Sequence, residues 1–449
     1  MAKNSKQYLC SNCSRIHGKW SGRCDHCTEW GTLGERPASA ASVVRSPTDT
    51  ERLCDVDQAQ SIPVPTTVEE IDRVLGGGFV PGSVTLLSGE PGIGKSTLAL
   101  QLALRIARSG AGVVLVSGEE APAQVAARAS RIHQHREMPQ TVEILDTVRT
   151  ESVIDLMERS RPQMLVVDSV QMLTFGDDSS SPGSANLLRT VAGALADAAK
   201  ALDVSLLLIG HVTKDGSLAG PRTLEHLVDT VLSFEGDRSN DLRFLRSMKH
   251  RFGPTNEVGL FEMAGTGLRP VADASARFLA DRNPDLPGTA VVPVLDGRRP
   301  VMVEIQALVR RSGDSAITGH GVPSGRLNLV AAVARQYLTG VMTGADLLVS
   351  AAGGAKITDP GADLAMLVAS VSAQLELPLS PGLAVCGEIG LSGELRRVAS
   401  MERRLHEAHR LGFTHCIVPR SCPDGPTGLS LQRCATIMEV IQLFAGVPA

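Results

Sequence analysis

The stretch GEPGIGKST, residues 89–97, decides the fold of this chain. It overlaps the end of the apolar run SVTLLSG (83–89) and leads into STLALQLALRIARSG (96–110), so a glycine-rich turn joins an expected strand to an expected helix. The stretch fits the pattern GxxxxGK[ST], in which glycines let successive backbone N–H groups face the phosphates of a nucleotide. The helix N-terminus adds the positive end of its dipole. An accidental glycine turn is the alternative, and the strand and helix on either side argue against it.

The side chains of this turn suit ATP with a bound magnesium ion. Lys95 is expected to bridge the terminal phosphates, and the Ser96 hydroxyl to ligate Mg²⁺. Asp168 ends the apolar run 164–167, where a magnesium-holding aspartate belongs, although a strand-terminal Asp is often only a helix cap. The residues expected to bind the nucleotide are Gly89, Glu90, Pro91, Gly92, Ile93, Gly94, Lys95, Ser96, Thr97 and Asp168.

A site that hydrolyses ATP also needs a carboxylate to orient the attacking water. Glu119 and Glu120 follow the apolar run 113–116 and are the available pair. Glu119 is the preferred base, because it is nearer the strand end, where the active face of such a sheet lies. Two solvated surface glutamates are the alternative.

The wider pattern predicts an α/β domain over residues 66–275. Further apolar runs, GVVLVSG (112–118), QMLVVDS (163–169) and VSLLLIGH (204–211), are separated by helical segments. Runs that are apolar on both faces and alternate with helices predict a parallel sheet. Residues 36–65 are expected to be a linker, and the junction DRNPDLPG (281–288) precedes a C-terminal region, 289–449, with its own strands and helices.

Residues 1–35 are expected to form a small zinc module. Two CxxC pairs separated by ten residues predict one tetrahedral four-thiolate Zn²⁺ site, which leaves no open position for catalysis and is therefore structural. Trp20 and Trp30 are expected to cover its apolar interior, with stacking on bases as the alternative. Residues 1–36 carry six Lys or Arg against three Asp or Glu, which suits a contact with nucleic acid or a partner. The expected ligands are Cys10, Cys13, Cys24 and Cys27.

The composition excludes several classes of protein. The 449 residues, 43% of them hydrophobic, predict two or three globular domains, and a net charge of −4 limits any nucleic-acid surface to a local patch. No apolar run reaches the ~18 residues of a membrane span, and the N-terminus lacks an apolar signal segment. With cysteines clustered as metal ligands, the expected location is the cytoplasm.

Further strings point to a known family. GHVTKDGSLAGPRTLEH (210–226), KHRFG (249–253), SGEE (117–120) and the Cys module occur together. With them the whole chain resembles the bacterial RadA family, also called Sms, of RecA-like ATPases. The signature of the family is Lys-Asn-Arg-Phe-Gly, and here His250 replaces the asparagine while both flanking cations remain. The resemblance implies a RecA-like core that assembles into a homo-oligomer, a hexameric ring, with ATP between subunits.

The resemblance also implies roles for individual residues. His211 would sense the γ-phosphate, and Lys249 and Arg251 would act as fingers from the neighbouring subunit, their i, i+2 spacing on a strand placing both on one face. Lys214 and Arg222 would contact DNA phosphates without regard to sequence. Solvated surface charges and an ordinary surface loop are the alternatives for these residues.

Together with these roles, the resemblance implies a DNA-dependent ATPase of recombinational DNA repair. It would translocate on single-stranded DNA and promote branch migration, with single-stranded and branched DNA and a RecA-type recombinase as partners. An ATP-dependent protease and a phosphotransfer or signalling ATPase are the alternatives.

The C-terminal region resembles the proteolytic α+β domain of Lon proteases, which use a serine and a lysine. Aligning DPGADLAM (359–366) places Ala362 at the nucleophile, and aligning EAHRLG (407–412) places Glu402 at the lysine. Without nucleophile and base no acyl transfer is expected, so we expect an inactive scaffold for ring assembly and a surface for DNA or a partner. Ser370 and Ser372 lie in the following helix and are not expected to replace the nucleophile.

Overall fold

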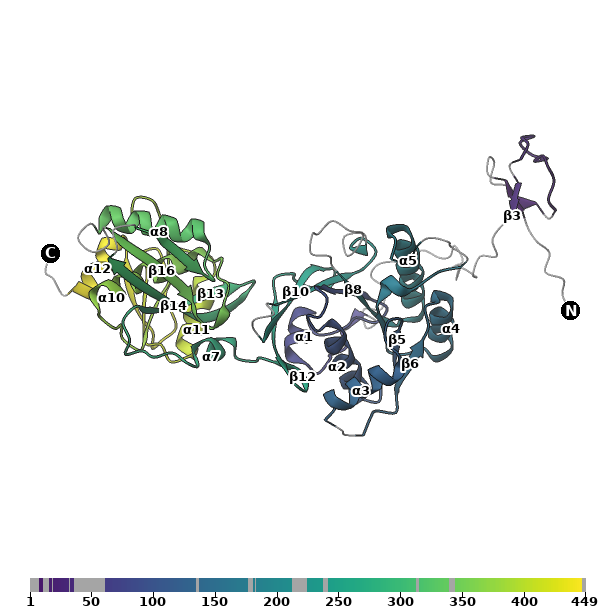
Figure 1. Cartoon of the computed structure of the whole chain (residues 1–449), viewed down its shortest axis with the longest axis horizontal. Coiled ribbons are helices and arrows are strands. Elements are labelled where there is room, and N and C mark those ends of the chain that lie inside the picture. Colours follow the sequence, from purple (N-terminus) through teal and green to yellow (C-terminus); the bar gives the residue numbers. More distant parts are fainter. Residues whose placement is uncertain are drawn as a thin grey trace.

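The computed structural model describes residues 8–10, 16–17, 19–31, 33–35, 61–134, 137–176, 181, 183–211, 224–236, 241–311, 315–338 and 344–445. Figure 1 shows two large folded bodies, which we call the core domain (61–270) and the C-terminal domain (274–445). Most of the expected linker 36–65 lies outside the described residues. Within the described ranges, no helix combines the length and the apolar character that crossing a bilayer requires.

A nine-stranded sheet forms the centre of the core domain, in the order β12-β11-β10-β9-β4-β8-β7-β5-β6. From β9 to β6 neighbouring strands are parallel, which confirms the expected α/β fold. Strands β10 to β12 extend it as an antiparallel meander. The strands are β4 (Val84–Gly89), β5 (Val113–Ser117), β6 (Val142–Asp146), β7 (Met164–Asp168), β8 (Ser205–His211), β9 (Thr230–Gly236), β10 (Leu242–His250), β11 (Val258–Ala264) and β12 (Gly267–Pro270).

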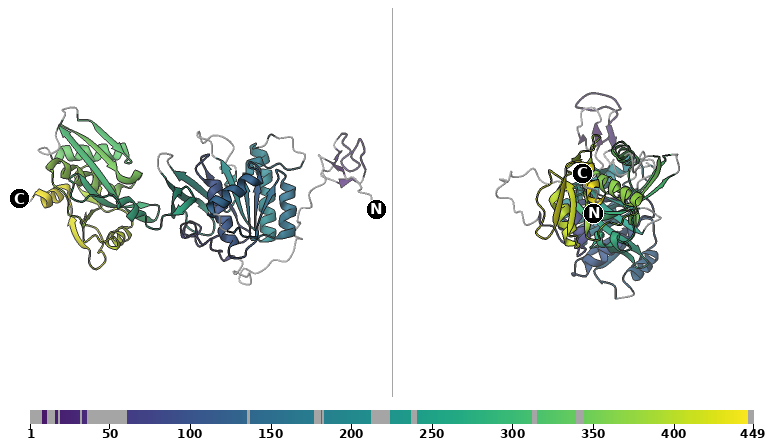
Figure 2. Two further views of the ribbon diagram at one scale, coloured as in Figure 1. Left: turned by 60° about the horizontal axis from the view of Figure 1, so that its bottom comes forward. Right: turned by 90° about the vertical axis from the view of Figure 1, so that its left-hand side faces the viewer.

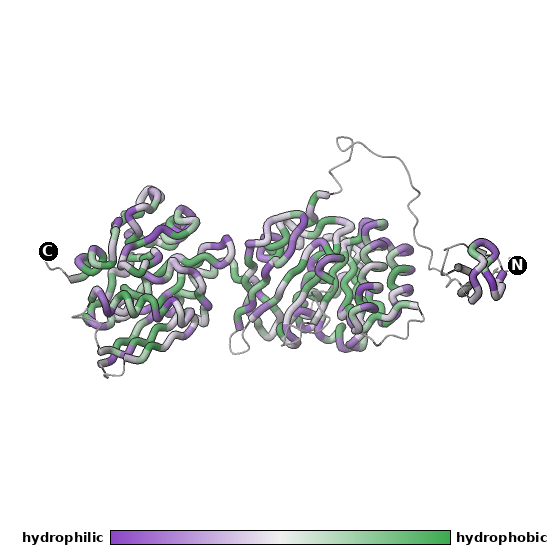
Figure 3. Tube along the Cα trace, turned by 90° about the horizontal axis from the view of Figure 1, so that it is seen from above, coloured by the Kyte–Doolittle hydropathy of each residue, from purple (hydrophilic) through white to green (hydrophobic). Residues whose placement is uncertain are grey.

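Helices cover both faces of this sheet (Figure 2). Side chains alternate along each strand, so Val113 and Leu115 pack in the cluster with α2, whereas Val114 and Val116 pack in the cluster with α4 and α5. Burial on both faces explains why these strands are apolar throughout, as the hydrophobic stretches along the tube in Figure 3 illustrate. The helices are α1 (Glu69–Val74), α2 (Lys95–Ala107), α3 (Pro122–Ile132), α4 (Thr150–Ser160) and α5 (Ala185–Leu202).

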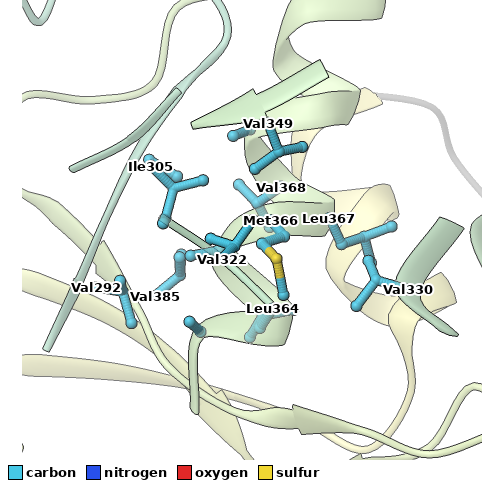
Figure 4. Packing of buried hydrophobic residues seen from close by; sticks show 14 of the residues in the cluster. Val292, Ile305, Val322, Val330, Val349, Leu364, Met366, Leu367, Val368 and Val385 are labelled. Carbon is cyan, nitrogen blue, oxygen red and sulfur yellow. The ribbon is translucent and has the colours of Figure 1, made fainter. Parts of the chain in front are cut away.

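The C-terminal domain is a mixed seven-stranded sheet in the order β15-β16-β14-β13-β17-β20-β21. One face carries α8 and α10, against which Val292 and Ile305 pack (Figure 4), and the other carries α11, against which Val291 and Met302 pack. Its elements are α7 (Ala274–Leu279), β13 (Thr289–Asp296), β14 (Arg299–Arg311), β15 (Ile317–His320), α8 (Ser324–Tyr337), β16 (Ala345–Ala351), α10 (Asp363–Leu375), β17 (Leu383–Val385), β18 (Glu388–Ile389), β19 (Leu395–Arg396), α11 (Met401–Arg410), β20 (His415–Pro419), β21 (Ser430–Cys434) and α12 (Ile437–Ala445).

The junction between the two domains lies earlier than the sequence indicated. The expected boundary at residue 275 divides α7, but Ala274 and Phe278 pack in the core of the C-terminal domain. Arg299, at the start of β14, reaches back across the junction. Its guanidinium donates to Glu70 of α1 at 2.5 Å and to the carbonyl of Ala272 at 2.8 Å.

The N-terminal segment contains a small sheet, β2-β1-β3, made of β1 (Tyr8–Cys10), β2 (Ile16–His17) and β3 (Leu33–Glu35). The tryptophans do not cover an apolar interior as expected. Trp20 is 63% exposed and Trp30 is 74% exposed, so the packing interpretation of these two side chains is wrong.

Candidate active site

The phosphate-binding turn is shaped by glycines at two positions that no other residue fits. Gly89 ends β4, and a Cβ on it would lie 2.3 Å from the carbonyl oxygen of Phe234 on β9. Gly94 precedes the first residue of α2 with φ +114°, in the region that side chains disfavour. The turn therefore brings the backbone of residues 89–94 to the N-terminus of a 13-residue helix.

Lys95 is the first residue of α2 and is 3% exposed. Its Nζ donates to the carbonyl oxygens of Gly89 at 2.8 Å and Glu90 at 3.0 Å. Burial lowers the pKa of Lys95, while the nearby carboxylates of Asp168 and Glu119 act in the opposite direction. The lysine and both expected carboxylates therefore share one electrostatic environment.

Ser96, Glu119 and Asp168 line one small cavity, of about 40 Å³, between α2 and the carboxyl ends of β5 and β7. A hydroxyl and carboxylates supply the hard oxygen ligands that Mg²⁺ prefers, so this set of side chains fits the expected ion. A larger cavity, of about 240 Å³, lies between the two domains. Its lining pairs Arg246 with Asp296 at 2.5 Å, and it lies apart from the phosphate-binding turn.

The fold distinguishes the two adjacent glutamates. The Ser169 hydroxyl donates to Glu119 Oε1 at 2.5 Å, which holds this carboxylate beside Asp168. Glu120 instead pairs with Arg128 of α3. Of these two partners, Ser169 could have been suspected from the sequence, because it directly follows Asp168, whereas nothing local marked Arg128.

His211 ends β8, and its backbone is paired in register with Gly89, the first residue of the phosphate-binding turn. This places the backbone of His211 at the start of the phosphate-binding turn. Gln171 lies next to Gly210, and its Oε1 is buried without a hydrogen-bond partner among the described residues. Sequence patterns gave no indication of Gln171.

Lys249 and Arg251 lie together but not on one strand. Strand β10 ends at His250, so the expectation that both cations share one strand face is wrong. Lys249 Nζ donates to the carbonyl oxygens of Glu225 at 2.6 Å and Val228 at 2.8 Å. Arg251 Nη1 donates to Asp229 Oδ1 at 2.9 Å. Both cations thus hold the segment 225–229 of their own chain.

A buried arginine links β10 to the phosphate-binding turn. Arg243 is 8% exposed, and its Nε donates to the carbonyl oxygen of Ile93 at 3.2 Å. The same strand therefore contacts the turn near one end and carries Lys249 near the other. No sequence motif marked Arg243, because the contact spans 150 residues of chain.

The C-terminal domain offers no nucleophile near the position of the lost serine among its described residues. Ala362 is buried, and the nearby Cys386, whose Sγ lies 3.3 Å from a Cβ built on Gly361, is also buried. Burial raises the pKa of Cys386 to about 12, so its sulfur is a thiol at neutral pH. Two serine hydroxyls are used in backbone contacts, that of Ser370 with the Met366 carbonyl and that of Ser372 with the Leu377 carbonyl. Glu402 is exposed at the start of α11.

The structure describes only some of the residues expected to bind zinc or DNA. Cys24 is fully buried and Cys27 partly buried, in a turn where the Thr28 amide donates to the Cys24 carbonyl at 2.9 Å. In the ranges given above, no group of three or more His, Cys, Asp and Glu side chains could hold a metal ion. Cys10 ends β1, while three residues lie outside the described residues: Cys13, Lys214 and Arg222.

Two known protein families match separate parts of the chain. Residues 48–217 match the model of an AAA domain, and residues 332–425 match the C-terminal proteolytic domain of Lon protease (S16). The first match contains the phosphate-binding turn, Asp168 and His211. The second contains Ala362 and Glu402.

Several relatives match over their full length. The DNA repair protein RadA of Mycobacterium tuberculosis is 41% identical, with 100% of this chain and 95% of that protein covered. Those of Brucella abortus and Bacillus subtilis are 41% and 36% identical, with 99% of this chain and 97% and 100% of those proteins covered. Among solved structures, an ATPase domain matches 47% of this chain and 92% of its own, at 16% identity and a TM-score of 0.41.

Proposed function

Because the chain belongs to the bacterial RadA family of DNA repair proteins, we propose that it is a DNA-dependent ATPase that translocates on single-stranded DNA and promotes branch migration. The observation that carries the proposal is the convergence of Lys95, Glu119 and Asp168 where β4, β5 and β7 end. Carboxylates and a lysine at the carboxyl ends of parallel strands form a site for phosphoryl transfer, and not for acyl transfer.

Each side chain of the site has a distinct task in this proposal. Lys95 leaves the carbonyls of Gly89 and Glu90 and binds the terminal phosphates. Ser96 and Asp168 would hold Mg²⁺, which neutralises charge on the phosphates when it is bound. Glu119 accepts a proton from the attacking water, and the Ser169 hydroxyl keeps its carboxylate oriented.

We assign Lys249 and Arg251 to the nucleotide of a neighbouring subunit in a hexameric ring. To reach it, both side chains must exchange their contacts with residues 225–229 for phosphate oxygens. One residue, Leu224, separates the segment 225–229 from residues 212–223, which contain the proposed DNA contacts Lys214 and Arg222. If Lys249 leaves the carbonyls of Glu225 and Val228 to bind phosphate, the state of the nucleotide would be linked to the neighbouring residues 212–223 and their proposed DNA contacts.

The N-terminal module supplies a structural zinc site in this proposal. The turn from Cys24 to Cys27 supports it, because a CxxC pair must fold back in this way to point both sulfurs at one ion. The other two ligands are Cys10 and Cys13. We also propose the cytoplasm as the location and a RecA-type recombinase as a partner, since branch migration acts on the product of strand exchange.

The decisive experiment compares ATP hydrolysis with and without single-stranded DNA for the wild type and for Lys95→Ala. We expect single-stranded DNA to stimulate ATP hydrolysis by the wild type. We also expect the wild type to move the branch point of a branched DNA with one homologous flank only when ATP is present. Lys95→Ala should lose both activities. A wild-type protein that ignores DNA, or that processes branched DNA without ATP, would refute the motor function.

A further inference from the structure

Both tryptophans of this chain lie on the N-terminal module, ten residues apart, and both are exposed. Tryptophan is among the more deeply buried residue types on average, and large exposed aromatic side chains concentrate at interaction sites. The other exposed large hydrophobic side chains of the described residues are aliphatic apart from Phe252 and Tyr337. Two exposed indoles on one short module therefore require an explanation other than packing.

The local structure holds the indole of Trp30 in place. Arg23 and Trp30 form an antiparallel bridge, and the Gly31 amide donates to the Gly22 carbonyl at 2.9 Å. A Cβ built on Gly22 lies 3.5 Å from the Trp30 ring, an ordinary van der Waals distance, so the indole lies against the opposite side of the hairpin. A ring fixed in this way loses little conformational freedom when a ligand stacks on it.

A guanidinium lies beside the same ring. The Cζ of Arg23 is 5.9 Å from the ring centroid of Trp30, and its Nε donates to the Thr28 carbonyl at 2.6 Å. Lys19, also exposed, directly precedes Trp20. A flat aromatic face next to a held guanidinium, with a second exposed indole and an exposed lysine on the same module, matches a ligand that carries phosphates and unpaired bases.

The charge of the module supports the same ligand. Residues 1–36 carry six Lys or Arg against three Asp or Glu, whereas the whole chain has a net charge of −4. Asp25 and Glu29 lie in the turn of the hairpin itself, so the excess of cations comes from the whole module. A positive module on a negative chain attracts an anionic ligand, and a nucleic acid is an anion that also offers flat faces to exposed indoles.

We propose that Trp20 and Trp30 form a stacking platform for the unpaired bases of single-stranded DNA, with Lys19 and Arg23 contacting the adjacent phosphates. The platform lies on the N-terminal module and would give the protein a contact with the strand in addition to the proposed contacts of Lys214 and Arg222. The identification of the ligand as single-stranded DNA rests on the proposed function. The chemistry of the platform, base stacking by indoles, is independent of ATP.

The intrinsic fluorescence of the full-length, zinc-loaded protein provides a direct test, because both of its tryptophans are in this platform. Titration with an oligothymidylate should quench the emission, since a base stacked on an indole shortens its excited state. An abasic oligomer of the same length presents the same phosphates without bases. It should bind more weakly and quench little, and equal binding and quenching by the two oligomers would overturn the proposal.

Substitutions separate the platform from the fold of the module. Trp20→Ala and Trp30→Ala should each weaken binding of the oligothymidylate roughly 5- to 150-fold, as expected for one lost base–aromatic contact. Trp30→Phe should retain most of the affinity, and all variants should keep the zinc content of the wild type. Leu391→Ala is the matched control, because Leu391 is 75% exposed on the C-terminal domain and should have no effect.

The outcomes distinguish this proposal from the proposed function. If single-stranded DNA stimulates hydrolysis but the emission and the affinities of the alanine variants do not change, the tryptophans serve a protein partner and the platform is wrong. If DNA neither stimulates hydrolysis nor binds, the motor function itself fails. Quenching by the oligothymidylate together with weakened alanine variants supports the platform.

Discussion

Glu119 and Glu120 are adjacent in the chain, yet the fold gives them different partners. Ser169, from the end of β7, orients Glu119 toward the site that contains Asp168. Arg128, from α3, holds Glu120, whose side chain is 39% exposed. A carboxylate whose oxygens are engaged by a guanidinium is poorly placed to orient an attacking water.

We therefore predict that Glu119→Gln lowers kcat for ATP hydrolysis about 10²–10⁴-fold, the contribution of a positioned general base. Nucleotide affinity should be nearly unchanged, because the phosphate contacts remain. Glu120→Gln, the matched control, should lower kcat less than about tenfold, since a partly exposed ion pair contributes about 1 kcal/mol or less. Steady-state kinetics and nucleotide binding measure both effects. A larger loss of kcat in Glu120→Gln than in Glu119→Gln would show that Glu120, and not Glu119, is the general base.

At the scale of the element, α10 of the C-terminal domain begins with a buried carboxylate. Asp363 is fully buried, pairs with Arg326 of α8 and accepts a hydrogen bond from the Ile389 amide at 3.2 Å. Burial raises the pKa of Asp363 to about 6, although the guanidinium of Arg326 acts in the opposite direction. The loss of solvation therefore outweighs the ion pair.

The folded protein binds a proton at Asp363 more tightly than the unfolded chain, whose aspartates have a pKa of about 3.9. The resulting stabilisation is present below about pH 4 and is lost as the pH rises through about 6, at a cost on the order of 2–3 kcal/mol. We predict that in Asp363→Asn the free energy of unfolding changes less with pH over this range than it does in the wild type. Calorimetric unfolding of the C-terminal domain within the full chain, from about pH 4 to about pH 7, measures it. An unchanged slope in the variant would contradict the assignment to Asp363.

Strand β14 joins the domains through Arg299, which is 9% exposed and pairs with the 1% exposed side chain of Glu70. We predict that Arg299→Ala loosens this junction, because removing one member of a buried pair costs about 3–5 kcal/mol. Cleavage near residues 271–273 in limited proteolysis should become faster. Arg298→Ala is the control, since Arg298 is 38% exposed and 3.8 Å from Glu257. Equal cleavage of both variants would show that the Arg299 pair does not secure the junction.

At the scale of the whole molecule, we propose that the side chains of Lys249 and Arg251 take two alternative positions. In a single chain they bind residues 225–229, and in a ring they reach the phosphates bound by a neighbour. The second position requires a site completed by two subunits. ATP hydrolysis should then depend on assembly.

Mixing two inactive variants tests this arrangement. Lys249→Ala should reduce DNA-stimulated hydrolysis by up to about 10³–10⁵-fold if the lysine acts as a finger. When Lys249→Ala subunits are mixed with Lys95→Ala subunits, the mixture should regain activity. Some interfaces in the mixed rings join an intact phosphate-binding turn of one subunit to an intact Lys249 of its neighbour. The recovered rate should approach about a quarter of the wild-type rate, the share of such interfaces in an equal random mixture. No recovery in assembled mixtures would place Lys249 in the site of its own subunit.

The sequence by itself determined the phosphate-binding turn and the parallel sheet. Each is encoded by neighbouring residues, because a strand, a glycine turn and a helix N-terminus follow one another along the chain. Only the tertiary structure decided which glutamate Ser169 orients, since their contact spans 50 residues. It also decided that α7 belongs to the C-terminal domain and that Trp20 and Trp30 are exposed. Exposure and pairing depend on which distant elements meet, and no local pattern records that.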